Sequence, residues 1–284
     1  SVKEKRSKVI GVIVPEIANY FCSAVIAGIE DIAYNMGYHV VIFQSHEKYE
    51  REVTNINLLA SRRIDGLIIS VSNETKKGTH LAELIDKGVP VVMFDRICDE
   101  IDTPRVVTDD AGGAYDATCH LAEQGYRRIA HVTMAPYLSV TKNRMKGYVN
   151  ALKKHKIPIE KKWIVHCDFD FGNIKKALHK LLKTTPKPNA ILVSSERIAI
   201  DCFEVLKEMK LRIPADIAMV GFFDNPVCRF IDPALTAVHQ PTFDIGQSAA
   251  RLLINMIEHN ALRLQYKTIE LKTTMEVRAS SMRK

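Results

Sequence analysis

The feature that most constrains the fold is a repeated alternation of short apolar runs with amphipathic helical segments. Val9–Pro15 is a continuous, β-branched run, which is typical of a strand covered on both faces. Asn19 can cap the helix that follows, Gly37 can end it, and Tyr38–Phe43 is the next strand run. This order predicts an α/β fold, with parallel sheets that carry helices on both faces.

The same rhythm continues along the chain. We expect further strands at Asp65–Ser70, Val89–Phe94, Arg105–Thr108, Arg128–Thr133, Trp163–His166, Asn189–Ser194, Ile217–Gly221 and Tyr266–Val277. We expect the other helices at Glu47–Arg63, His80–Lys87, Ala111–Gln124, Arg144–His155, Asn173–Lys183, Glu196–Met209 and Asp244–His259. About ten strands approach the limit of one strongly twisted sheet, so two sheets in two lobes are more economical.

Composition indicates an ordinary globular protein, with 46% hydrophobic and 26% charged residues. No apolar run approaches the roughly 18–20 residues of a spanning helix. The N-terminal run Val9–Val14 is too short for a signal peptide core of about 7–15 residues, so we expect a cytoplasmic protein without membrane contact. The six cysteines show no CxxC spacing, and we expect reduced, mostly buried thiols.

Enzyme and cofactor motifs are absent from the sequence. It has no GxGxxG, GxxxxGK[ST], GxSxG or HExxH pattern, and its ten histidines show no metal-ligand spacing. His131 lies inside a predicted strand and is expected to be a core histidine. The net charge of +7 is mildly suggestive of an anionic partner, but the lysines are scattered and no helix-turn-helix pattern is present. We expect no catalysis, no metal and no cofactor.

Polar and aromatic side chains gather where the predicted strands end, which is where open α/β sheets bind ligands. Apolar ring faces can stack on aromatic side chains, and each buried ligand hydroxyl needs a hydrogen bond, so this mixture suits a sugar or a nucleobase. Two alternatives stay open. Each of these residues could be an ordinary polar residue at a loop entry. Asp95 and Arg96 could be an ion pair that braces a hinge.

The chain resembles the effector-binding core of the lactose/galactose/purine repressor family, which is similar in fold to periplasmic sugar-binding proteins. Arg144 and Gly147-Tyr148 match at their spacing, and the resemblance covers nearly all of Lys8–Val277. It rests on the runs VIGVIVPEIANYFCSAVIAGIEDIAYNMGYHV, RRIDGLIIS, GVPVVMFDR, GYRRIAHV and DPALTAVHQP.

The resemblance implies two Rossmann-like lobes joined by three crossovers. One lobe would comprise residues 8–108 and 240–267, and the other residues 109–239 and 268–284. Residues 1–7 would be the remnant of a linker to a helix-turn-helix head that is absent from this chain. A homodimer that contacts DNA through that head is implied as well.

The resemblance also assigns site residues by position. Phe21 matches an aromatic residue that packs on the ligand, and Cys22 stands where a second aromatic is usual. Arg144 matches an arginine that reaches ligand hydroxyls or a carboxylate. The full ligand-binding prediction is Asn19, Tyr20, Phe21, Cys22, Ser45, Ser70, Asp95, Arg96, Arg144, Ser195, Glu196, Phe223, Asp224 and Gln240.

One position departs from the family pattern. Phe223 occupies the place of an acid that usually grips the ligand, and Asp224 either substitutes for that acid or turns to solvent. We therefore expect a ligand that stacks more and hydrogen-bonds less on this side than a plain hexose.

These observations predict the effector-sensing core of a transcriptional regulator. A small sugar, sugar acid or nucleobase would bind between the lobes, favour the closed state and so change operator affinity. The alternatives are a free-standing solute-binding protein for a transporter and, more weakly, an enzyme of the same shape.

Overall fold

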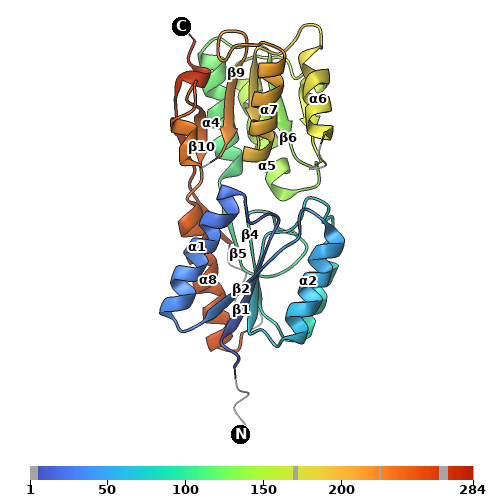
Figure 1. The fold of residues 1–284 in the computed structure, drawn as a ribbon, viewed down its shortest axis with the longest axis vertical. Helices are drawn as coiled ribbons and strands as arrows, with labels where there is room; N and C mark the ends of the chain where they lie inside the picture. The colour runs from blue at the N-terminus through green and yellow to red at the C-terminus, as the bar shows by residue number, and fades with distance from the viewer. Residues whose placement is uncertain (1–5, 169–171, 224, 262–267, 284) are drawn as a thin grey trace. The chain divides into compact units, whose positions relative to one another are not determined.

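The chain forms two compact units, each built on one sheet. The structure is a computed structural model that describes residues 6–168, 172–223, 225–261 and 268–283. Unit 1 comprises Ser1–Thr108 and Pro241–Leu271, and unit 2 comprises Asp109–Gln240 and Lys272–Lys284, so the chain passes from one to the other three times. Each sheet has six strands flanked by helices (Figure 1), which confirms the predicted α/β class with two parallel sheets and three crossovers.

The sheet of unit 1 is parallel throughout, in the order β11-β5-β4-β3-β1-β2. Its strands are β1 (Val9–Val14), β2 (His39–Gln44), β3 (Gly66–Ile69), β4 (Val91–Phe94), β5 (Arg105–Thr108) and β11 (Thr268–Leu271). Helices α1 (Tyr20–Asn35) and α8 (Thr242–Glu258) pack on one face, and α2 (Tyr49–Ser61) and α3 (Thr79–Asp86) on the other. The central strands β1, β3 and β4 are therefore buried on both faces, as their apolar runs predict, whereas the edge strands β2 and β11 stay partly exposed.

Local sequence signals explain how α1 begins, ends and packs. Asn19 Oδ1 accepts a hydrogen bond from the Cys22 amide, which caps the helix. Gly37 follows its C-terminal end at φ +76°, a conformation that favours glycine. A Cβ atom at Gly28 would lie 2.1 Å from the Phe243 carbonyl oxygen, so only glycine allows α1 and α8 to pack this closely.

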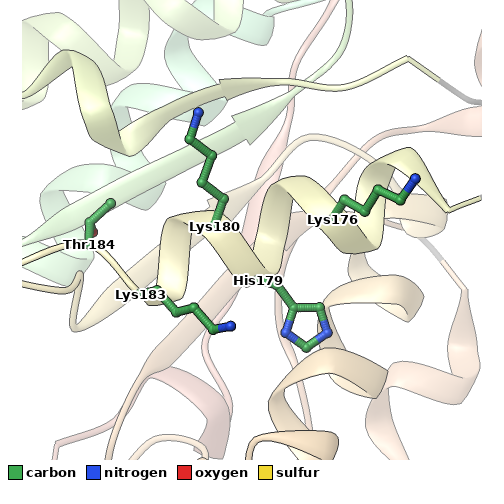
Figure 2. A pocket seen from close by; sticks show the side chains of 5 residues that line it. All are labelled: Lys176, His179, Lys180, Lys183 and Thr184. Carbon is green, nitrogen blue, oxygen red and sulfur yellow. The ribbon is translucent and has the colours of Figure 1, made fainter.

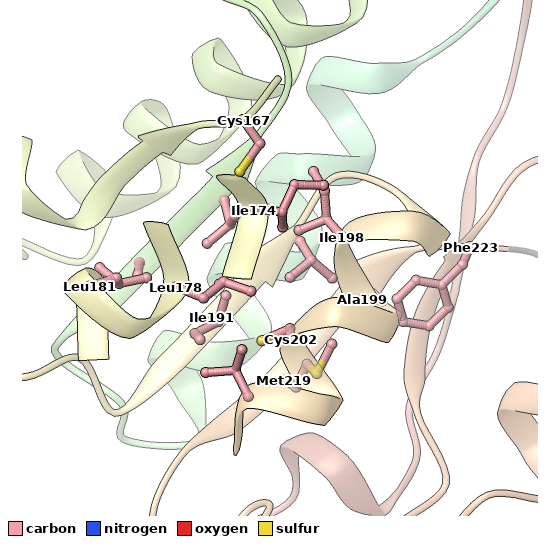
Figure 3. Close-up of a cluster of buried hydrophobic side chains, with 14 of the residues drawn as sticks. Cys167, Ile174, Leu178, Leu181, Ile191, Ile198, Ala199, Cys202, Met219 and Phe223 are labelled. Carbon is pink, nitrogen blue, oxygen red and sulfur yellow. The ribbon is translucent and has the colours of Figure 1, made fainter. Parts of the chain in front are cut away.

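The sheet of unit 2 has the order β12-β10-β9-β8-β6-β7, and only its edge strand β12 is antiparallel to its neighbour. Its strands are β6 (Ile129–Thr133), β7 (Ile164–His166), β8 (Ala190–Val193), β9 (Ala218–Phe222), β10 (Thr236–His239) and β12 (Thr274–Glu276). Helices α4 (Asp110–Glu123) and α5 (Ser139–Lys154) cover one face. Helices α6 (Asn173–Leu182) and α7 (Glu196–Glu208) cover the other, where Leu178 and Ile198 pack toward Ile191 of the sheet (Figure 3).

Two expectations differ from the structure. Helix α5 begins at Ser139 rather than Arg144, because Ser139–Asn143 has no apolar helical pattern that would reveal it. The closing run Tyr266–Val277 is two strands, β11 in unit 1 and β12 in unit 2, and the units divide after Leu271 rather than after residue 267. An extended run looks the same in sequence whichever sheet edge it joins.

The six cysteines are free and buried. Burial raises the pKa of Cys98, Cys167 and Cys202 to about 12. In the part of the chain that the structure describes, none of the helices is both long and apolar enough to span a bilayer.

Candidate functional site

In unit 1, a buried ion pair lies just beyond the carboxyl ends of the strands. Nη1 of Arg96, two residues after β4, lies 2.6 Å from Oε1 and 3.0 Å from Oε2 of Glu47, three residues after β2. Their side chains are only 11% and 14% exposed. The guanidinium is therefore held in one orientation by a carboxylate from the neighbouring loop.

Cys22 belongs to the same cluster. Burial raises the pKa of its thiol to about 12, the charge of Asp95 adds to this effect, and the charge of Arg96 opposes it. Asp95 itself has φ +57°, which is uncommon for a residue other than glycine, and its amide donates to Val106 O at 3.0 Å. The structure thus brings three predicted site residues together: Cys22, Asp95 and Arg96.

The other predicted residues of unit 1 line the same edge of the sheet. The Ser45 amide donates to Val14 O and the Ser70 amide to Ile13 O, so both serines continue their strands beside β1. Both are buried, and Ser45 Oγ has no hydrogen-bond partner among the described residues. Tyr20 and Phe21 are half-buried in the first turn of α1, after the capping residue Asn19.

In unit 2, Arg144 is the corresponding buried cation. Its Nε lies 2.8 Å from Asp110 Oδ1, and its Nη1 donates to the carbonyl oxygen of Ser194. The guanidinium carbon lies 4.0 Å from the ring centroid of Phe222. Arg144 and Asp110 are each only 4% exposed, so the guanidinium is fixed by three elements of the unit: α4, β9 and the loop after β8.

Uncharged polar residues lie on the neighbouring strand β6 and on the first turn of α5. His131 stacks on Tyr148 with ring centroids 5.1 Å apart, and its Nδ1 lies 3.1 Å from Leu192 O. Burial lowers the pKa of His131 to about 4, with a smaller contribution from the charge of Arg144. The structure confirms a core histidine. Thr133 shares its side of β6, and Thr141 precedes Arg144 by one turn.

The remaining predicted residues of unit 2 are engaged by the protein. Ser195 Oγ accepts from the Ile198 amide and caps α7, and Glu196 Oε1 accepts from Asn225 Nδ2 at 2.7 Å. Phe223 is 3% exposed and packs beside Ala199 in the core (Figure 3). Gln240 is buried at the end of the first segment of unit 2. Asp224 lies outside the described residues.

Three important carboxylates were not predicted: Glu47, Glu52 and Asp110. Glu52 is fully buried and accepts hydrogen bonds from the Ser72 amide, Thr75 Oγ1 and His80 Nε2, at 2.6, 3.0 and 2.6 Å. Its position four residues before the inward-facing Ile56 is a sequence signal that could have revealed it. The sequence does not distinguish Asp110 and Glu47 from ordinary surface residues, because acidic residues are common near the starts of helices.

Two other features of the described residues were candidates for a functional site: groups of metal-binding side chains and a hollow on α6. No group of three or more His, Cys, Asp or Glu side chains in these residues could hold a metal ion. A shallow hollow on α6 is lined by exposed lysines and half-buried residues (Figure 2), namely Lys176, His179, Lys180, Lys183 and Thr184. No buried polar group lines it, so it is an ordinary solvated helix face.

Comparisons with known proteins identify the family of the chain. The family of periplasmic binding proteins and sugar-binding domains of the LacI family matches residues 7–274. The HTH-type transcriptional repressor CytR of Escherichia coli is 32% identical over 258 residues, which are 91% of this chain and 75% of the relative. Catabolite control protein A of Priestia megaterium is 31% identical over 279 residues, 98% of this chain and 82% of that protein.

A solved structure supports the same assignment. The LacI family transcriptional regulator from Enterococcus faecium with bound ribose has a TM-score of 0.83 and 28% identity, and the alignment covers 96% of this chain and 98% of that one. The predicted resemblance is therefore confirmed: the chain belongs to the LacI family of periplasmic-binding-protein-like, sugar-binding domains.

Proposed function

We propose that this chain is the effector-sensing core of a DNA-binding transcriptional regulator. A small polar molecule binds through the candidate residues at the carboxyl edges of the two sheets, and binding changes the affinity of the whole regulator for operator DNA. The relatives named as repressors favour this function over that of a free-standing solute-binding protein. The core itself catalyses no reaction, acts in the cytoplasm and works as a homodimer.

One observation carries the proposal: each sheet has a buried, oriented arginine at its carboxyl edge. Arg96 is held by Glu47 in unit 1, and Arg144 is held by Asp110 in unit 2. Such preorganised donors bind a polar ligand without a large ordering cost. The regulator of Enterococcus faecium binds ribose on a similar fold, which makes a sugar or a related metabolite a reasonable ligand for this chain.

Regulation requires that the effector distinguish two states. The three passages of the chain between the units are short, and hinges of this kind absorb changes of domain angle. An effector that binds one arrangement of the chain more tightly than another stabilises that arrangement. It alters DNA affinity through a helix-turn-helix head only as far as it prefers that arrangement.

Thermal unfolding of the purified chain with a panel of sugars, sugar acids and nucleosides tests the proposal. A ligand present at about 100 times its Kd should add roughly 2.7 kcal/mol of stability and raise the melting temperature. A flat response across a wide panel contradicts an effector-sensing role. Chromatography of the same mixtures tests for catalysis. A product formed from a bound compound would contradict the proposal that the core catalyses no reaction.

Binding should also depend on Arg144. Arg144→Lys retains the positive charge but loses the planar fork, and it should weaken the binding of the identified ligand by at least tenfold. Lys146→Ala is the matched control, because Lys146 is exposed on the same helix. If the parent protein and Arg144→Lys bind the ligand with equal affinity, Arg144 is not a ligand-binding residue.

A further inference from the structure

Glu52 of α2 anchors the loop that follows β3. Its fully buried carboxylate accepts hydrogen bonds from the Ser72 amide at 2.6 Å and from Thr75 Oγ1 at 3.0 Å, and it lies 2.6 Å from His80 Nε2. The two hydroxyl oxygens of Ser72 and Thr75 are 2.7 Å apart, which closes the loop on itself. The ring of Tyr49 packs edge-on against His80, with centroids 5.1 Å apart. One carboxylate thus fixes both the loop and the first turn of α3.

Glu74 makes the reverse connection, from the loop to the start of α2. The helix begins after Lys48, whose side chain does not cap it. Oε2 of Glu74 accepts a hydrogen bond from the Tyr49 amide, the first of the helix, at 3.0 Å, and its Oε1 accepts one from Lys48 Nζ at 2.8 Å. Residues 46–52 and 71–80 are therefore tied together from both sides, and we call these two segments the loop pair.

Both segments of the loop pair contact Arg96. The Val71 amide donates to the Arg96 carbonyl oxygen at 3.2 Å, and Val71 O lies 3.5 Å from Arg96 Nη1. From the other segment, Glu47 Oε1 lies 2.6 Å from the same Nη1. Val71 is the immediate neighbour of Ser72 in sequence. The backbone that touches Arg96 is therefore continuous with the backbone that Glu52 anchors.

The backbone next to Arg96 is strained. His46, Glu47 and Asp95 have φ values of +50°, +63° and +57°. Residues other than glycine keep such a conformation where the surrounding contacts impose it. At Glu47 these contacts are the ion pair with Arg96 on one side and the bonds of Glu74 to the start of α2 on the other. The orientation of the guanidinium thus depends on the loop pair as a whole.

We propose that Glu52 is a positioning residue for Arg96. It acts through Ser72 and Val71, so its replacement loosens the loop and the contact between Val71 and Arg96. The inference rests on the proposed function for the purpose of holding Arg96 in place. The positioning itself is a property of the chain without ligand.

Glu52→Gln tests this inference, because glutamine keeps the size of the side chain and one acceptor oxygen but loses the charge and the second acceptor. Hydrogen exchange of the Val71 amide, followed by NMR in the ligand-free chain, reports the contact with Arg96. The Val12 amide in the central strand β1 reports the opening of the whole unit. We expect the Val71 amide to exchange about tenfold faster or more in the variant, and the Val12 amide to change much less.

The comparison of the two amides separates positioning from general stability. Equal acceleration at Val71 and Val12 overturns the inference, because Glu52 would then only stabilise the unit. An unchanged rate at Val71 overturns it as well. Glu50→Gln, on an exposed side chain of the same helix, is the matched control and should leave both rates unchanged.

A second variant decides the inference if Glu52→Gln does not fold. Thr75→Val removes only one of the hydrogen-bond donors to Glu52, and it should speed exchange of the Val71 amide about threefold or more with little change at Val12. The same two outcomes, equal acceleration or an unchanged Val71 rate, overturn the inference here. Both measurements are made without ligand, so their failure leaves the proposed function intact, and a flat thermal panel leaves them decisive.

Discussion

Arg144 and Asp110 form a buried ion pair, with Nε 2.8 Å from Oδ1 and each side chain only 4% exposed. In such a pair the attraction mainly compensates for the removal of two charges from water. Loss of one partner is therefore more harmful than the net worth of the pair suggests. It follows that Arg144 is a structural residue as well as a predicted ligand contact, and that replacing it by alanine tests both roles at once.

Asp110→Ala should destabilise the protein by about 3–5 kcal/mol, because the Arg144 charge then stays buried without its carboxylate. Urea unfolding followed by circular dichroism measures this change. Asp116→Ala, on an exposed position of α4, should change the free energy of unfolding by less than about 0.5 kcal/mol. Equal stability of the two variants would show that the pair contributes nothing to folding.

Glu52→Ala should lower the free energy of unfolding by about 3 kcal/mol or more. The substitution removes the acceptor for the Ser72 amide, Thr75 Oγ1 and His80 Nε2, and unsatisfied buried donors cost about 1–3 kcal/mol each. Glu50→Ala, on the exposed face of the same helix, is the matched control. Denaturant unfolding of both variants measures the change in the free energy of unfolding. A loss below about 1 kcal/mol for Glu52→Ala would show that the buried hydrogen bonds of Glu52 contribute little to stability.

Phe223→Ala should cost about 3–5 kcal/mol, since it removes a ring that is 3% exposed and leaves a cavity in the core. Phe230, which is 83% exposed, provides the control, and Phe230→Ala should be nearly neutral. Thermal melts compare the two. A small effect at Phe223 would mean that its ring does not belong to the core but is free to contact a ligand, as the family resemblance alone implies.

The arrangement of the strands could be predicted because the central strands of both sheets are buried on both faces. Runs such as Val9–Val14 then read as continuously apolar, and among the described helices α1, α4 and α7 begin at a capping side chain, as at Asn19. The division of the last extended segment between two sheets could not be predicted, because β11 and β12 are edge strands with mixed burial. Edge strands carry little periodic signal.

The candidate site was predictable only in part. Strand ends and the family resemblance identify Asp95, Arg96 and Arg144. Neither identifies their partners, because pairing depends on how elements far apart in sequence approach each other. Helices α4 and α5 come so close that a Cβ atom at Gly147 would lie 2.1 Å from Ala111 O, and this contact brings Asp110 to Arg144.

The stability of unit 2 should depend on pH through His131. Burial lowers the pKa of His131 from 6.5 to about 4 in the folded protein, whereas the unfolded chain keeps the ordinary value. Between these values the unfolded state binds more protons, so the contribution of His131 is complete above pH 6.5 and is lost as the pH falls toward 4. The loss across this window is on the order of 3 kcal/mol. His120, whose pKa is also lowered by burial, acts in the same direction.

His131→Phe isolates this contribution, because phenylalanine keeps a ring against Tyr148 and removes both the titrating group and an unpartnered nitrogen. Urea unfolding at pH 7 and pH 4.5 should show that the variant loses roughly 2–3 kcal/mol less stability than the parent protein. His39→Gln, at an exposed position of β2, should retain the parent's pH dependence. If His131→Phe and the parent protein lose the same unfolding free energy between pH 7 and pH 4.5, the imidazole is already protonated in the folded state. That result would contradict the assignment of His131 as a buried, neutral residue beside Arg144.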